Sequence, residues 1–114
     1  MNLKQISEQL HLTLLTEPGA FEDKAAPGAY CSDLLSCVMA GAKPGSLWIT
    51  LQAHMNVIAV ATLLELSAVI LSEGVQPDAA VIQKANGQGV TLFSSPESSY
   101  TLCGRLWELG VRAS

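Results

Sequence analysis

Four polar residues alternate along the segment LWITLQAHMNVIAVATLLE, which covers residues 47–65. They are Thr50, Gln52, His54 and Asn56, and most of the residues around them are apolar. In an extended chain, side chains at alternate positions point the same way, so these four would share one face. We expect Thr50, Gln52 and Asn56 to hydrogen bond to a small ligand. His54 would then set a pH dependence near neutrality.

The elements that must position these residues follow from the pattern on either side. The apolar segment SLWITL before them is typical of a buried strand. From about Asn56 onward, apolar residues recur at helical spacing. The four polar residues therefore stand at a predicted junction between a strand and a helix.

The same alternation continues along the chain. We predict strands at LTLLT, SLWITL, SAVIL and VTLF, separated by helices of about ten residues. The predicted helices begin near capping or first-turn residues, namely Asn2, Ser32, Asn56, Pro77 and Pro96. Residues 18–28 are predicted as a loop and residues 111–114 as a frayed tail. This pattern predicts a single α/β domain over residues 1–114, with a largely parallel sheet and helices on both faces.

In a parallel sheet, every strand-to-helix loop emerges at the carboxyl edge, where small ligands tend to bind. Four predicted loops emerge there: 30–33, 52–56, 72–74 and 94–97. They contribute further polar candidates, namely Ser32, Asp33, Ser94 and Ser95. Helix N-termini behind Ser32, Asn56 and Ser95 would direct free N–H groups toward an anionic ligand.

Composition limits the class of protein. The chain has 114 residues, of which 49% are hydrophobic and 14% charged, which excludes disorder. Its net charge of −4 and six scattered basic residues argue against binding nucleic acid. The low charge content favours a homodimer. With no secretory signal and no apolar run long enough for a membrane span, we expect a cytoplasmic protein.

The chain contains three cysteines, Cys31, Cys37 and Cys103. The three cysteines fit free thiols in a reducing compartment, and we expect Cys31 and Cys37 to be small buried residues, with no metal or cofactor bound. A nucleophilic hydrolase would combine Ser32 or Cys31 with His54 and Asp33. The chain lacks GxSxG and any complete catalytic motif, so we expect no enzyme activity.

Several long segments resemble one protein family. The segments SDLLSCVMAGAKPGSLWIT, QAHMNVIAVA and LFSSPESSYTLCGRL resemble the stand-alone members of the DRTGG-domain family, and LKQISEQLHLTLLT looks like its leading helix and strand. The family is similar in fold to the N-terminal domain of bacterial HPr kinase/phosphorylase. The resemblance implies a regulatory or dimerising module in a prokaryote. The string that names the family is absent, and the corresponding loop reads SEGVQPD.

These observations predict a non-catalytic regulatory or sensor domain. It would bind a small polar or anionic ligand, with nucleotides among the candidates, or a partner protein. The alternative is a pure interaction or dimerisation domain without a ligand. A small hydrolase that uses His54 is the third hypothesis.

Overall fold

The structure is a computed structural model that describes residues 1–19, 21 and 24–113. The helices are α1 (Leu3–Gln9), α2 (Leu35–Gly41), α3 (Met55–Leu63), α4 (Ala79–Gln88) and α5 (Ser99–Glu108). The strands are β1 (Thr13–Leu14), β2 (Ala29–Cys31), β3 (Leu47–Thr50), β4 (Ala68–Leu71) and β5 (Leu92–Ser94). Within the described residues no helix is long and apolar enough to cross a membrane.

The strands form one five-stranded sheet in the order β1-β5-β4-β3-β2. The pairs β2–β3, β3–β4 and β4–β5 are parallel, and β1 joins β5 antiparallel. Each parallel strand therefore lies beside its predecessor, and the sheet grows in one direction from β2 to β5. The predicted α/β fold with a largely parallel sheet is confirmed.

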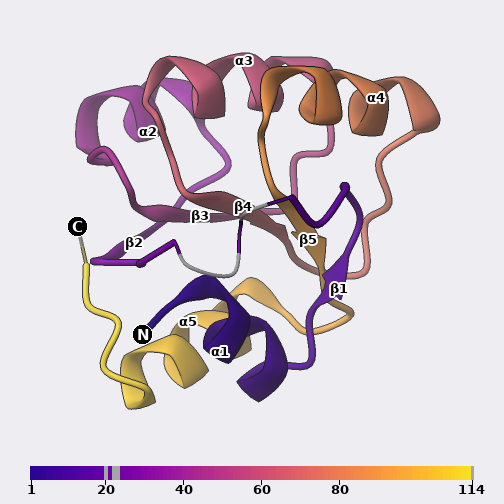
Figure 1. Ribbon diagram of the computed structural model, residues 1–114. Helices are drawn as coiled ribbons and strands as arrows, with labels where there is room; N and C mark the ends of the chain where they lie inside the picture. Colours follow the sequence, from indigo (N-terminus) through magenta and orange to yellow (C-terminus); the bar gives the residue numbers. More distant parts are fainter. Residues whose placement is uncertain (20, 22–23, 114) are drawn as a thin grey trace.

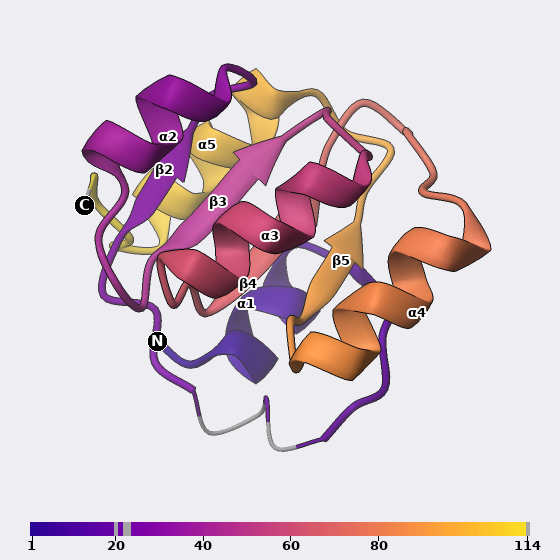
Figure 2. The same ribbon diagram turned by 90° about the horizontal axis from the view of Figure 1, so that it is seen from above.

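This order explains how the helices are arranged on the two faces. Parallel crossovers are right-handed, so successive strands added in one direction place their connecting helices on the same face. The connecting helices α2, α3 and α4 do cover one face, and α1 and α5 cover the other (Figures 1 and 2).

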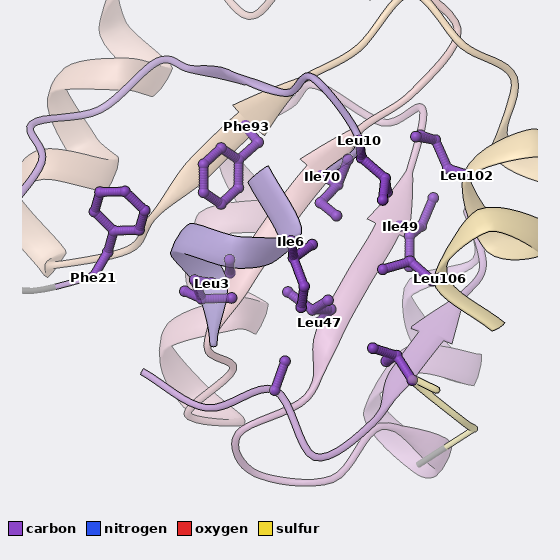
Figure 3. Close-up of a cluster of buried hydrophobic side chains, with 13 residues drawn as sticks. Leu3, Ile6, Leu10, Phe21, Leu47, Ile49, Ile70, Phe93, Leu102 and Leu106 are labelled. Carbon is purple, nitrogen blue, oxygen red and sulfur yellow. The ribbon is translucent and has the colours of Figure 1, made fainter. Parts of the chain in front are cut away.

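Both faces of the sheet are buried, as the continuously apolar strands predicted. Alternate residues of a strand point to opposite faces, so Leu47 and Ile49 of β3 pack in the layer with α1 and α5. Trp48, between them, packs in the layer with α2, α3 and α4. Figure 3 shows the first layer, where Ile6 of α1 and Leu106 of α5 meet the strands. The central strands are therefore packed on both sides.

The N-terminal helix begins as predicted. The Asn2 side chain accepts a hydrogen bond from the Gln5 amide at 2.8 Å, and the Gln5 side chain accepts from the Asn2 amide at 3.0 Å. This reciprocal pair is a capping box, which satisfies two amides that the helix itself leaves unpaired.

The C-terminal segment differs from the predicted frayed tail. Val111 is buried, and the Ala29 amide of β2 donates to the carbonyl of Arg112 at 2.9 Å. Residues 29 and 113 also form an isolated parallel bridge. The apolar Val111 side chain fixes this segment beside β2, because its burial in the layer of α1 and α5 offsets the loss of chain entropy. Ser114 lies outside the described residues, as do residues 20, 22 and 23 of the predicted loop.

Candidate functional site

The four predicted loops follow one another along the carboxyl edge of the sheet. Beyond the strands, Ser32 donates its amide to the Ile49 carbonyl at 3.3 Å, and Ser72 donates its amide to the Thr50 carbonyl at 3.0 Å. The Ser95 amide likewise donates to the Leu71 carbonyl at 2.9 Å. These hydrogen bonds extend the strand pairing into the loops, so the loops form one continuous row.

Asp33 organises the first part of this row. The Thr50 hydroxyl donates to Asp33 Oδ1 at 2.7 Å, and the Leu51 amide donates to the same oxygen at 2.9 Å. Thr50 is fully buried whereas Asp33 is exposed. Among the described residues, no hydrogen bond reaches Oδ2 of Asp33. One carboxylate oxygen is therefore anchored to the sheet and the other is available at the surface.

Two further polar groups complete the Asp33 cluster. The Gln52 side chain donates from Nε2 to the Asp33 carbonyl at 3.1 Å, and the Gln52 amide donates to the Thr50 hydroxyl at 3.1 Å. The buried Trp48 indole donates to the Ser32 carbonyl at 2.9 Å. We define the Asp33 cluster as the hydrogen-bonded residues Asp33, Thr50 and Gln52 together with Ser32, which precedes Asp33 in the chain.

A second cluster joins the loop after β4 to the start of α5. The Glu73 carboxylate accepts from the Ser99 amide at 2.9 Å, and the hydroxyls of Ser72 and Ser99 share a hydrogen bond of 2.5 Å. The Glu73 amide donates to the Glu97 carbonyl at 2.8 Å, and the Gly74 amide to the Ser95 carbonyl at 3.0 Å. These contacts hold Glu73 at a φ of 61°, in the left-handed region that costs a non-glycine residue energy.

The helix starts at Ser32 and Ser95 were predicted wrongly, whereas the helix predicted from about Asn56 begins at Met55. The α2 helix begins at Leu35 with Leu34 as N-cap, and the Ser32 hydroxyl accepts instead from the Leu34 amide at 3.1 Å. Asp33 precedes that helix, and its side chain accepts a hydrogen bond from the Leu51 amide just after β3. In both cases, hydrogen bonds to neighbouring backbone compete with capping.

The remaining helix starts are shifted by one to three residues. Ser98, rather than Ser95, caps α5, and the Ser95 hydroxyl accepts from the Glu97 amide at 3.1 Å. Pro77 precedes the N-cap Asp78 of α4 instead of opening the helix. Asn56 lies in the first turn of α3, whose N-cap is His54.

This arrangement changes the expected electrostatics of the edge. The first turn of α5 is not free to bind a ligand anion, because its Ser99 amide already donates to the Glu73 carboxylate. None of the four loops contains Lys or Arg, whereas they contain Asp33, Glu73 and Glu97. The edge is therefore acidic, and it favours a ligand that offers hydrogen-bond donors.

The other predicted site residues lie outside the Asp33 cluster. His54 is exposed at the N-cap of α3, and its side chain makes no capping hydrogen bond. Asn56 is also exposed, and Ser94 is buried at the end of β5. The structure thus joins Asp33, Thr50 and Gln52 by hydrogen bonds, with Ser32 next to Asp33 in the chain, and within the described residues no side-chain hydrogen bond brings His54 or Asn56 into this network.

The arrangement that a hydrolase would need is not formed within the described residues. No hydrogen bond there connects the His54 side chain with Ser32, Cys31 or Asp33. Burial raises the pKa of the Cys31 thiol to about 12, with smaller contributions from the Cys103 thiol and from the Asp33 charge. A nucleophilic cysteine needs the opposite shift, because the thiolate is the reactive form.

Two features of the structure escaped the sequence prediction. Glu73 and Ser99 were not named as interacting residues, although an acidic residue in a loop beside a helix start is a usable signal. Cys31 and Cys37 are exposed, contrary to the expectation that both are buried. Nothing in their spacing indicates this, because exposure depends on which elements cover them.

Comparison with known proteins gives two findings. The family model of the DRTGG domain matches residues 5–109. The chain is also similar to a crystal structure of the CBS and DRTGG domains of the regulatory region of Clostridium perfringens pyrophosphatase, complexed with the activator diadenosine tetraphosphate. The TM-score is 0.76 at 16% sequence identity, and the match covers 92% of this chain and 45% of that one. Comparison with curated protein sequences gives no match.

Proposed function

The chain belongs to the DRTGG domain family, as its resemblance predicted, and on that premise we propose that it is a non-catalytic regulatory or sensor domain. Its site is the carboxyl edge of the sheet, where the Asp33 cluster binds a small polar ligand. The observation that carries this proposal is the Asp33 carboxylate. Its Oδ1 accepts hydrogen bonds of 2.7 and 2.9 Å from the sheet, which orients Oδ2 for a ligand.

The surroundings of Asp33 suggest the chemistry of that ligand. An exposed carboxylate accepts hydrogen bonds from hydroxyl or amino groups. In or directly next to the loops of this edge are the exposed apolar side chains Leu34, Leu51 and Met55, which are 61%, 42% and 43% exposed. A nucleoside offers both a donor-rich sugar and an apolar ring. The complex of the pyrophosphatase regulatory region with diadenosine tetraphosphate supports testing nucleotides first.

His54 and Asn56 are the proposed contacts for an anionic group of the ligand. They lie at the start of α3, where no side chain caps the helix. Amides at an uncapped N-terminus favour negative charge.

The competing hypothesis is an interaction domain that binds no small ligand. The exposed apolar side chains Leu34, Leu51 and Met55 support it, since such groups also mark protein interfaces. We further propose that the chain acts as a homodimer in the cytoplasm, with the three free cysteines in their reduced state.

A thermal-shift screen of nucleosides, nucleotides, dinucleoside polyphosphates and simple anions tests the ligand hypothesis. A ligand that binds the folded chain stabilises it by RT ln(1 + [L]/Kd), so the shift must grow with concentration. For a ligand found in this way, Asp33→Asn should weaken binding about 10- to 100-fold, because one hydrogen bond to a charged group is lost. Glu8→Gln is the matched control, because it removes the same charge from an exposed position on α1.

The variants separate the hypotheses. In a sensor, His54→Ala folds normally and loses much of the shift given by an anionic ligand, while Glu8→Gln retains it. If the whole panel produces no shift with the unmodified chain, the sensor hypothesis fails and the interaction domain is favoured. If Asp33→Asn and Glu8→Gln bind equally well, the ligand site lies elsewhere.

A further inference from the structure

We propose that Cys31 and Cys103 form a dithiol site for a soft metal cation that accepts two ligands, of which Cu(I) is the representative. The proposal is independent of the ligand site at the carboxyl edge. It depends on where the fold brings two distant cysteines together, and on what the fold places around them.

Strand alternation directs Cys31 toward α5. Cys31 ends β2, two residues after Ala29, and Ala29 packs in the layer of α1 and α5. Because side chains two apart on a strand share a face, Cys31 points to that layer too. Cys103 on α5 packs against the same layer. The third cysteine, Cys37, lies on α2, which covers the opposite face (Figures 1 and 2).

Cys31 and Cys103 line one cavity of about 200 Å³ between β2 and α5. Its other walls include Ile49, Leu106, Trp107 and Arg112. Cys31 is exposed and Cys103 partly exposed, so an ion in solution can reach both sulfur atoms. The apolar walls limit competition from water for the bound ion.

The two thiols belong to neighbouring walls of this cavity, Cys31 on β2 and Cys103 on α5. Two thiolates in contact repel each other, and a cation placed between them removes that repulsion. A coordinated thiol is deprotonated for the same reason.

The ligand set selects the type of metal. Among the described residues there is no group of three or more His, Cys, Asp or Glu that could hold a metal ion. Structural Zn²⁺ takes four protein ligands, so this pair serves it poorly. Thiolates select soft ions such as Cu(I). Binding is not a redox step: two S–H bonds lose their protons to solvent, two S–Cu bonds form, and the complex carries one negative charge.

Arg112 supplies the compensating charge. Its guanidinium stacks on the Trp107 ring at 4.2 Å from the ring centroid, and both residues line the cavity. Arg112 also donates a hydrogen bond to the Trp107 carbonyl, which holds the guanidinium in place. A bis-thiolate anion formed in this cavity would therefore face a fixed positive group.

Anaerobic Cu(I) titration against a chromophoric Cu(I) chelator tests the proposal. The unmodified chain and Cys37→Ser should each withdraw one Cu(I) per chain from the chelator. Cys31→Ser and Cys103→Ser should each lower the affinity for Cu(I) by more than about 100-fold. Removing a residue that only hydrogen bonds to a metal ligand lowers metal affinity about 10- to 100-fold, and removing a ligand itself costs more. Zn²⁺ in equal amount should not displace the bound Cu(I).

X-ray absorption of the Cu(I)-loaded unmodified chain is the second measurement, and it does not depend on how the variants fold. Two sulfur neighbours with no nitrogen or oxygen would support the site. Binding that survives in Cys31→Ser, or that disappears in Cys37→Ser, would overturn it. So would a copper environment with nitrogen ligands.

Discussion

At the scale of single residues, Thr50 links the core to the surface. Its side chain is buried, yet its hydroxyl donates to the exposed Asp33 carboxylate and accepts from the Gln52 amide. A buried hydroxyl without a partner costs free energy, and the partners of Thr50 are the proposed binding groups. The same contacts that satisfy Thr50 therefore orient the site.

Replacing Thr50 with Val keeps the shape of the side chain and removes both hydrogen bonds. We expect Thr50→Val to lower the free energy of unfolding by about 1–3 kcal/mol, since the lost bond to Asp33 is charge-assisted. Urea unfolding measures the change. Thr62→Val is the control, because Thr62 is exposed and its hydroxyl bonds only to its own helix, donating to the Ile58 carbonyl at 2.8 Å. Equal losses in the two variants would contradict the role assigned to Thr50.

Sequence reasoning at this scale found the polar residues but not their partners. Thr50, Gln52, Ser32 and Asp33 were selected because of their types and their places in loops. The hydrogen bond from Thr50 to Asp33 spans 17 positions. No local pattern encodes such a contact, because it depends on β2 and β3 pairing side by side.

At the scale of elements, serines account for the misplaced helix starts. Both Ser32 and Ser95 accept a hydrogen bond from the amide two residues ahead. The same hydroxyl geometry serves turns and helix caps, so the residue type cannot distinguish them. The choice is made by tertiary contacts, since each loop is already bonded to the neighbouring strand. Four of the five strands were predictable because their apolar pattern is strong, whereas β2 (Ala29–Cys31) was missed, because three residues are too few to show a periodicity.

The start of α5 offers a prediction at this scale. Glu73→Gln should lower the free energy of unfolding by about 0.3–1 kcal/mol, because it removes a negative charge from a helix N-terminus and retains an acceptor for Ser99. The loss should shrink in 1 M NaCl, where charges are screened beyond roughly 3 Å. Thermal melting at low and high salt measures both effects.

Glu65→Gln is the matched control for this charge effect. Glu65 is exposed and also has a positive φ, 55°, but it follows the C-terminus of α3. An acidic residue there opposes the helix dipole, so its neutralisation should leave stability unchanged or raise it slightly. A loss of stability in Glu65→Gln as large as that in Glu73→Gln would show that the helix dipole does not account for the effect of Glu73.

At the scale of the whole molecule, the sheet couples two layers that share no helix. The layer with α1 and α5 and the layer with α2, α3 and α4 meet the same three central strands. The sequence predicted helices on both faces because the strands are apolar on both sides. The sequence did not indicate that β1 would pair antiparallel with β5. Strand order depends on which strands meet in the folded chain, and the composition of a single strand does not determine this.

We expect the two layers to unfold together, as small single domains usually do. Trp48 reports on one layer and Trp107 on the other, because Trp48 packs under α2, α3 and α4 and Trp107 lies on α5. In Trp107→Phe and in Trp48→Phe, the fluorescence midpoint in urea should therefore match the far-UV circular dichroism midpoint of the same variant. Midpoints that differ within one variant would show that the layers unfold separately.

The segment after α5 also affects how molecules meet one another. A sheet with free edges can pair with the edge of another sheet, and that pairing begins aggregation. Here one edge strand, β1, spans just two residues. On the other edge, the carbonyl of Arg112 occupies the first outward amide of β2, at Ala29. The short stretch from Val111 to Ala113 thus covers the start of the longer edge strand, which leaves less of this apolar sheet free to pair with a neighbouring molecule.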